Sequence, residues 1–293
     1  MNVTHIPLSP DAVAAVTTQM GAMRSQPPVL PADADRTPVL PHTGGVPGEW
    51  VTAPRDPANP AAAAETGVTV YVHGGGFEYT NPHLEMIMAY RLSRATGRPA
   101  LAVSYRLVPD HPYPAALDDV LTAYRSLLDQ GVPASRIVLA GESAGATLVL
   151  SALLVLKQTG DPLPAAALAV SPQTDLTLSS PSIDANDGQD FVNRAVLDHV
   201  RTRYLAGARP DQAPQSPLYG ELGGLPPLLL AVGSKEVLLD DARRFAEAVS
   251  AAGGSVHLDV YEGMPHAFHA TVLPDTPLPV ATVFLRRLTE WIG

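Results

Sequence analysis

Short apolar segments alternate with longer amphipathic segments through most of the chain, and this alternation limits the fold more than any other feature. The short segments have the length and composition of buried strands, whereas the longer ones have apolar residues at helical spacing. Strands are predicted at 68–72, 99–104, 136–140, 165–170, 226–232 and 255–261. Helices are predicted near 83–96, 115–129, 144–158, 240–252 and 277–292. Strands that alternate with helices form parallel sheets, so we expect an α/β fold: a mainly parallel central sheet with helices on both faces.

Two segments depart from this alternation. Residues 1 to about 25 have a helical pattern with a Ser-Pro-Asp start signal at 9–11, and the Pro-rich segment that follows contains one further predicted strand near 49–53. Residues 176–216 are rich in Asp, Ser, Pro and Gln. We interpret them as an insertion that is partly helical around 194–206.

The composition is that of an ordinary globular protein, with 46% apolar and 16% charged residues. We expect a single domain over residues 1–293. Lys plus Arg minus Asp plus Glu is 19 − 29 = −10, so the field of the molecule repels phosphate backbones and anionic membrane surfaces. Neither nucleic acid nor a membrane is therefore an expected partner. The chain has no cysteine, which excludes disulfides and thiolate metal sites.

No part of the sequence has the pattern of a membrane-targeting segment. The first residues, MNVTHIPLSPDAVAAV, lack the basic and long apolar regions of a secretory signal, and no later stretch has about 18 uninterrupted apolar residues. We therefore expect a cytoplasmic protein. Its oligomeric state stays open, with a homodimer as one alternative.

The sequence GESAG at 141–145 lies between a predicted strand and a predicted helix. A bare Gly-x-Ser-x-Gly pattern arises by chance quite often, but in this context it is typical of a nucleophile elbow, a sharp turn that presents a serine hydroxyl. The alternative is a tight turn with an ordinary serine. Ser143 is the candidate nucleophile.

A second glycine motif, YVHGGGF at 71–77, also lies at the end of a predicted strand. Successive glycines allow backbone N–H groups to turn inward, where they can stabilise an oxyanion. The alternatives are a phosphate-binding loop or a plain glycine turn. No G-x-G-x-x-G spacing and no Walker Lys-Ser/Thr pair follows, which weakens the nucleotide interpretation. We interpret His73 as a structural residue, because the acid–base histidine of such folds comes late in the chain.

A late histidine extends the pattern. His266 lies in a loop just after the predicted strand 255–261 and follows the acidic segment at 236–241. The resulting order of serine, acid and histidine is that of α/β-hydrolases. His269 is the nearest alternative base, and His257 within the strand is interpreted as a packing residue.

From about residue 65 to 293, the chain resembles the hormone-sensitive-lipase-like esterases, a group of bacterial carboxylesterases in the α/β-hydrolase superfamily. The motifs that carry this resemblance are HGGGF, SYRLVPDHPYPAALDD (104–119), GESAGA, SPQTDL (171–176), VGSKEVLLDD and HAF. The combination, in this order, is highly specific.

The resemblance implies an α/β-hydrolase fold and assigns roles by position. Ser143 corresponds to the nucleophile and His266 to the base, and the oxyanion donors correspond to the backbone N–H groups of Gly75, Gly76 and Ala144. A small helical cap over the site is also implied, formed by about 1–45 and 176–216.

Three positions outside the acid segment depart from the pattern of the family. Glu142 and Ala146 stand where the family usually has Asp and Gly, and Ser104 stands where Asp commonly precedes the Tyr-Arg pair. We expect these exchanges to affect the support of the elbow rather than the chemistry.

The acid of the family usually appears as Gly-x-x-Asp-x-Leu, and the spacing from Gly233 places Glu236 at that position. Glutamate keeps the charge with a similar reference pKa. Asp240 and Asp241 fall in a predicted helix, where we expect one of them to cap the N-terminus. Lys235 is interpreted as a solvated neighbour, and the alternative is that it helps to keep the acid ionised.

Together these features predict a carboxylesterase that acts on a small-molecule ester through an acyl-serine, with Ser143, His266 and Glu236 as the triad. This chemistry requires no metal and no organic cofactor. A deacylase, lactonase or dehydratase of a secondary metabolite would share the same residues, and a non-catalytic ligand-binding protein is a further alternative. Modest apolar side chains in the expected cap favour short acyl groups; they are Val13, Met20, Met23, Phe191 and Val192.

Overall fold

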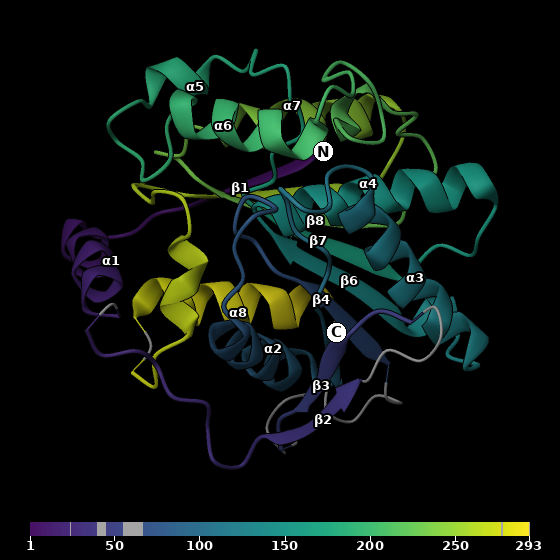
Figure 1. Ribbon diagram of the computed structural model, residues 1–293. Coiled ribbons are helices and arrows are strands. Elements are labelled where there is room, and N and C mark those ends of the chain that lie inside the picture. The colour runs from purple at the N-terminus through teal and green to yellow at the C-terminus, as the bar shows by residue number, and fades with distance from the viewer. Residues whose placement is uncertain (24, 40–44, 55–66, 277, 293) are drawn as a thin grey trace.

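The computed structural model describes residues 1–23, 25–39, 45–54, 67–276 and 278–292. Its nine strands form one sheet in the order β1-β9-β8-β7-β6-β4-β5-β3-β2. They are β1 Asn2–Ile6, β2 Asp35–Val39, β3 Gly48–Thr52, β4 Val68–Val72, β5 Ala100–Val103, β6 Ile137–Glu142, β7 Ala166–Val170, β8 Leu228–Gly233 and β9 Val256–Tyr261. β3 pairs antiparallel with β5 and with β2, whereas the other pairings are parallel (Figure 1). The predicted α/β fold with a mainly parallel sheet is confirmed.

The helices connect these strands. They are α1 Pro10–Ala22, α2 Pro82–Thr96, α3 Ala115–Asp129, α4 Ala144–Thr159, α5 Ser182–Ala185, α6 Arg194–Leu205, α7 Leu239–Ala251 and α8 Pro279–Ile292, with short 3₁₀ helices η2 Ala134–Arg136, η3 Pro217–Tyr219 and η4 Phe268–Val272. The strands and helices predicted between 68 and 292 agree with the observed bounds to within two residues. The N-terminal start signal is also confirmed, because Ser9 caps α1 by accepting a hydrogen bond from the Ala12 N–H.

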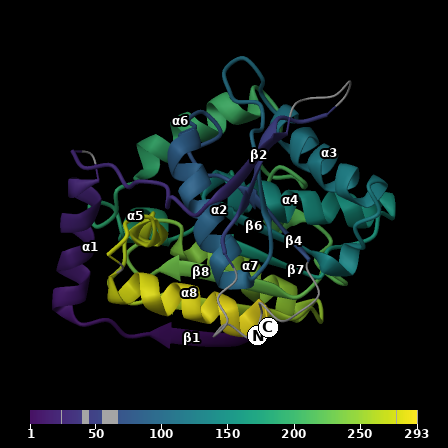
Figure 2. The same ribbon diagram turned by 90° about the horizontal axis from the view of Figure 1, so that it is seen from below.

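Two apolar cores cover the two faces of the sheet. Successive side chains of a strand point to opposite faces, so Val70 and Val72 belong to the core that includes α3, α4 and α7, while Tyr71 belongs to the core that includes α2 and α8. Figures 1 and 2 both show α2 and α8 side by side, with α1 beside them at one end. Because parallel strands are buried on both faces, their sequences are almost continuously apolar, which is why they were predictable.

Sequence periodicity does not identify the two outermost strands. Four of the five residues of β1 are exposed, and β2 is equally open and contains Pro38. Such polar strands are suited to a sheet edge, where one side needs no partner, but they carry no buried-strand signal. Both strands belong to the central sheet, so the prediction that residues 1–45 form part of a cap is wrong for 2–6 and 35–39.

The segment between β7 and β8 lies apart from the sheet. It contains α5 and α6, which lie with α7 at the top of Figure 1, on the opposite side of the sheet from α2 and α8. A small buried cluster joins it to the loop after β8; the cluster consists of Leu178, Ile183, Leu197, Val237 and Leu238. The insertion therefore has its own apolar contact with a loop at the carboxyl end of the sheet.

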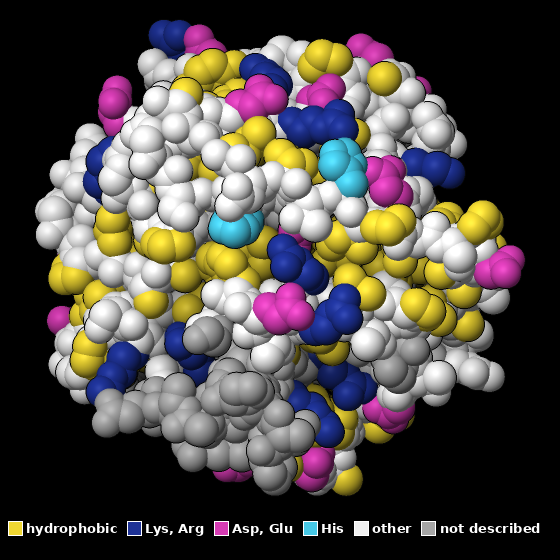
Figure 3. Space-filling view, turned by 180° about the vertical axis from the view of Figure 1, so that it is seen from behind, with side chains coloured by type: hydrophobic (Ala, Val, Ile, Leu, Met, Phe, Trp, Pro, Cys, Tyr) yellow, Lys and Arg dark blue, Asp and Glu magenta, His cyan; other side chains and the backbone are white. Residues whose placement is uncertain are grey.

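The surface mixes both signs of charge. On the face shown in Figure 3, acidic and basic side chains are interspersed with apolar ones. Among the helices of the described ranges, none is long and apolar enough to cross a membrane.

The start of α7 differs from its prediction. Leu238 is the N-cap residue and makes no side-chain cap, so Asp240 and Asp241 do not cap this helix. Instead, Asp240 accepts a hydrogen bond from the Ser182 N–H of the insertion at 2.9 Å. Asp241, which has no exposed surface, accepts hydrogen bonds from the N–H groups of Thr174 and Asp175 at 2.7 and 2.8 Å. Burial raises the pKa of Asp241 to about 6, although these hydrogen bonds oppose the shift.

Asp241 is therefore predicted to hold the loop after β7, and its removal to cost stability. In Asp241→Ala the N–H groups of Thr174 and Asp175 lose a buried acceptor, at about 1–3 kcal/mol for each group left unpaired. Asp241→Asn keeps an acceptor oxygen and is expected to lose less. Urea unfolding compares the two variants with Asp240→Ala, whose carboxylate is partly exposed. Equal stability of the Ala and Asn variants would contradict this role.

Candidate active site

Ser143 lies at the sharp turn between β6 and α4, with φ of 51° and ψ of −121°. This conformation is rare for a residue with a side chain, and the neighbouring glycines make room for it. A Cβ atom at Gly145 would collide with the backbone oxygens of Val72 and His73. The strand, the turn and the helix thus place the hydroxyl of Ser143 at the carboxyl edge of the sheet.

Two further side chains form a continuous hydrogen-bonded line with this serine. Ser143 Oγ lies 3.0 Å from His266 Nε2, and His266 Nδ1 lies 3.0 Å from Glu236 Oε2. Glu236 has no exposed surface, and its other oxygen accepts hydrogen bonds from the Gly233 N–H at 2.6 Å and from the Ser171 hydroxyl at 2.8 Å. Ser171, which follows β7, begins the SPQTDL motif, but the sequence analysis assigned it no role.

The surroundings of His266 favour its charged form. Burial lowers the pKa of this imidazole, but the hydrogen bond and negative charge of Glu236, with the charges of Asp190 and Glu142, outweigh burial and raise it above the ordinary value. A histidine in such a setting accepts a proton readily.

The predicted oxyanion donors lie around the same cavity as Ser143. Within the described ranges, the N–H groups of Gly75, Gly76 and Ala144 have no intramolecular acceptor, so they are available to a ligand. The glycine loop is fixed from below, because the Tyr105 hydroxyl donates to the backbone oxygen of His73 at 2.9 Å. The His73 ring stacks on the Tyr105 ring, with the ring centroids 4.2 Å apart. His73 therefore packs beneath the glycine loop as a structural residue.

The other candidates make no hydrogen bond to the serine, although His269 lines the same cavity. His269 pairs with Glu142, and His257 is in β9. Lys235 is exposed, and Asp240 and Asp241 are bonded to the insertion and to the loop after β7.

Comparison with known proteins identifies the family of the chain. Residues 69–270 match a family described as alpha/beta hydrolase fold. An acetyl-hydrolase of Streptomyces hygroscopicus is 42% identical over 233 residues, 78% of each chain, and an esterase of Acinetobacter venetianus is 34% identical over 90% of this chain and 84% of its own. A crystal structure of an esterase from the bacterial hormone-sensitive lipase family, 34% identical, matches with a TM-score of 0.85 over 98% of each chain.

The chain belongs to the hormone-sensitive-lipase-like esterases of the α/β-hydrolase superfamily. It is a carboxylic ester hydrolase.

Two cavities of this hydrolase lie side by side. One, of about 290 Å³, contains Ser143 and His266, and the other, of about 430 Å³, extends along α2 and η4. They share the lining residues Gly74, Gly75, Glu142, Ala267 and His269.

The insertion forms part of the wall of the cavity that contains Ser143. Its lining side chains from this part of the chain are Val192, Val196, Leu197 and Val200. Of the apolar residues expected in the cap, Val192 lines this cavity, whereas Val13, Met20 and Met23 pack against the core that includes α2 and α8. Phe191 is 54% exposed.

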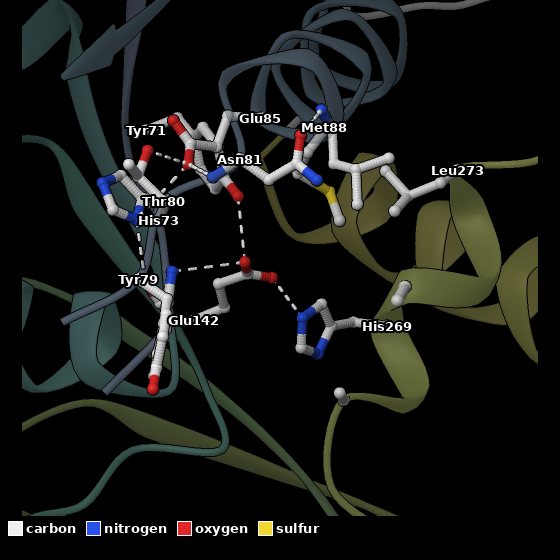
Figure 4. Close-up of a pocket in the computed structure, with 15 residues that line it drawn as sticks. Tyr71, His73, Tyr79, Thr80, Asn81, Glu85, Met88, Glu142, His269 and Leu273 are labelled. Carbon is white, nitrogen blue, oxygen red and sulfur yellow. Dashed lines mark hydrogen bonds and ion pairs between the residues drawn. The ribbon is translucent and has the colours of Figure 1, made fainter. Parts of the chain in front are cut away.

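Glu142 is the centre of a polar network between the two cavities of the hydrolase (Figure 4). Its carboxylate forms an ion pair with His269 and accepts hydrogen bonds from the Tyr71 hydroxyl at 3.0 Å and the Gly74 N–H at 3.3 Å. Glu142, which stands where the family usually has Asp, thus links the elbow to the glycine loop. Among the described residues, no group of three or more His, Cys, Asp or Glu side chains is arranged to hold a metal ion.

Burial alone would raise the pKa of Glu142. The charge and hydrogen bond of His269, with the donors of Gly74 and Tyr71, outweigh burial and lower this pKa from 4.5 to about 2. A carboxylate with a lowered pKa in the folded state stabilises the fold above the pKa of the unfolded state. That contribution is lost as the pH falls from about 4.5 toward 2.

Glu142→Gln is therefore predicted to destabilise the hydrolase in a pH-dependent way. The difference between 4.5 and about 2 corresponds to on the order of 3 kcal/mol near neutral pH. Urea unfolding at pH 7 and at pH 3 should show a large loss at pH 7 that shrinks at pH 3. The exposed Glu221 provides the control Glu221→Gln, and an equal loss at both pH values would show that the charge of Glu142 is not responsible.

Proposed function

We propose that this hydrolase cleaves soluble esters with short acyl groups through an acyl-serine intermediate, with Ser143 as nucleophile, His266 as general base and Glu236 as the acid that orients it. The observation that supports this proposal is the hydrogen-bonded line from Ser143 Oγ through both nitrogens of His266 to Glu236. Each group in the line has the partner that its role requires.

In the first step, Ser143 Oγ attacks the ester carbonyl while His266 Nε2 takes the hydroxyl proton. Glu236 fixes the tautomer of the imidazole through Nδ1 and stabilises the imidazolium that forms. The charge that develops on the carbonyl oxygen is held by the N–H groups of Gly75, Gly76 and Ala144, each worth about 3 kcal/mol in comparable sites.

In the second step, His266 returns the proton to the leaving alcohol, and the acyl group stays on Ser143. Water then enters, His266 takes its proton, and attack on the acyl-serine releases the acid and restores the hydroxyl. All of these proton transfers use one histidine, whose raised pKa fits a base that must hold a proton between steps.

The exchange of Asp for Glu at 236 fits the loop after β8. The Gly233 N–H donates to Glu236 Oε1 at 2.6 Å, so the side chain folds back over its own turn. This conformation accommodates the extra methylene while the second oxygen faces the imidazole. Lys235 is a solvated neighbour in this mechanism, since its side chain is exposed.

Ser143→Ala is predicted to remove labelling by a serine-reactive fluorophosphonate and to leave at most weak residual hydrolysis.

Glu236→Gln should lower kcat on the order of 10²- to 10⁴-fold with the fold retained, because the neutral amide no longer stabilises the imidazolium. Steady-state kinetics and circular dichroism measure both effects, with Lys235→Gln as the matched control. Near-normal ester hydrolysis by Ser143→Ala would exclude the proposed mechanism.

The proposed acyl preference rests on two observations. The cavity at Ser143 has a volume of about 290 Å³, and side chains of α6 form part of its wall: Val196, Leu197 and Val200. One relative is named an acetyl-hydrolase. A short acyl group can remain beside Ser143, whereas a long chain would have to displace these α6 side chains.

Hydrolysis of p-nitrophenyl esters is therefore expected to be fastest for acetate to butyrate and to fall for longer acyl chains. In Val200→Ala the decline should begin at a greater chain length, because the side chain that lines the cavity becomes smaller. Fastest turnover on emulsified long-chain triglycerides would contradict the proposal. Faster turnover of matched amides or lactones would instead favour the alternative deacylase or lactonase.

A further inference from the structure

Asp190 contacts two of the active-site loops but belongs to neither. It lies in the insertion between α5 and α6. Its Oδ1 accepts a hydrogen bond from the His266 N–H at 2.6 Å, and its Oδ2 accepts one from the Val237 N–H at 2.9 Å. Val237 directly follows Glu236, so one carboxylate joins the loop of the acid to the loop of the base.

A second residue of the insertion holds the acid loop from its carbonyl side. Asn186 Nδ2 donates to the backbone oxygens of Glu236 at 2.8 Å and Ser234 at 3.2 Å. Beneath these polar contacts, the apolar cluster formed by Leu178, Ile183, Leu197, Val237 and Leu238 is buried. The insertion thus fixes the acid loop by packing and by hydrogen bonds to both kinds of backbone group.

The insertion also contacts the glycine loop. Glu78, which follows that loop, pairs with His199 at 3.2 Å and Arg203 at 3.1 Å on α6. A Cβ atom at Gly76 would meet the side chain of Val200. Contacts from one insertion therefore reach the loops that carry the acid, the base and the oxyanion donors.

We propose that Asp190 is a positioning residue of the triad, which makes the insertion part of the catalytic frame as well as a cover over the cavity. This inference rests on the proposed roles of Ser143, His266 and Glu236. Asp190 fixes the backbone at His266 and the backbone after Glu236 relative to each other. It thereby sets the separation of the imidazole and the carboxylate.

The charge of Asp190 gives this role a measurable signature. The charged groups that face His266 are Glu236 from the loop after β8, Asp190 from the insertion and Glu142 from the elbow, which is itself paired with His269. The negative charge of Asp190 favours the imidazolium. Loss of that charge therefore lowers the pKa of His266, and the acid limb of kcat/KM, which reports the base of the free enzyme, moves to lower pH.

The test compares Asp190→Asn and Asp190→Ala in the full chain, with Asp187→Asn as the control at an exposed position of the same loop. Asp190→Asn removes the charge and keeps one acceptor, whereas Asp190→Ala removes both. Active sites are counted by fluorophosphonate titration, so that unfolded molecules do not enter kcat. Thermal unfolding is recorded for each variant.

The expected result for Asp190→Asn is a shift of the acid limb to lower pH with a lowered kcat and little change in KM. Asp190→Ala should show the same shift and a larger loss of kcat, up to about 100-fold, because small displacements of reacting groups have effects of that size. Asp187→Asn should match the wild type. If Asp190→Ala does not fold, the acid limb of Asp190→Asn decides the question.

A lowered melting temperature with unchanged kcat and an unchanged acid limb would overturn the proposal and leave Asp190 a purely structural residue. Failure of the triad itself would look different. In that case the wild type would not react with the fluorophosphonate, or Ser143→Ala would keep its activity.

Discussion

Glu236 is a carboxylate with no exposed surface, and burial of such a charge is unfavourable unless hydrogen bonds and an opposite charge surround it. Both of its oxygens have partners: the Gly233 N–H and the Ser171 hydroxyl on one side, and His266 on the other. Ser171 follows β7, Gly233 is the last residue of β8, and His266 follows β9; these three strands are neighbours in the sheet. Parallel pairing brings their carboxyl ends to one edge, so the requirement to satisfy one buried charge also fixes three loops around the imidazole.

Features that depend on neighbouring residues were predictable from the sequence. The parallel strands are buried on both faces and therefore have continuous apolar segments, and the glycines of GESAG are required by the backbone of the turn itself. Glu236 could be chosen over the later aspartates because the turn immediately after β8 lies at the carboxyl edge of the sheet. In each case the deciding constraint acts within a few residues.

Features that depend on distant partners were not predictable. Glu142 and His269, like Asp190 and Val237, are brought together by the folded chain, and no spacing in the sequence links them. The capping role expected for Asp240 and Asp241 failed for the same reason, because backbone N–H groups of the insertion and of the loop after β7 are their partners. The edge strands β1 and β2 were missed because exposed strands need no apolar pattern.

The three carboxylates around His266 have two opposing effects on this histidine. In the proposed mechanism, negative charge near His266 favours the imidazolium that forms when Ser143 gives up its proton, and that contribution favours the transition state. The same charge raises the pKa of the free imidazole, so an excess of it would leave His266 protonated before the substrate binds. The ion pair with His269 offsets the charge of Glu142. Asp190 accepts hydrogen bonds from two backbone N–H groups, and these reduce the effect of its charge on His266. Glu236 then remains the carboxylate whose oxygen is hydrogen-bonded to the imidazole ring, which is the arrangement that the proposed general base requires.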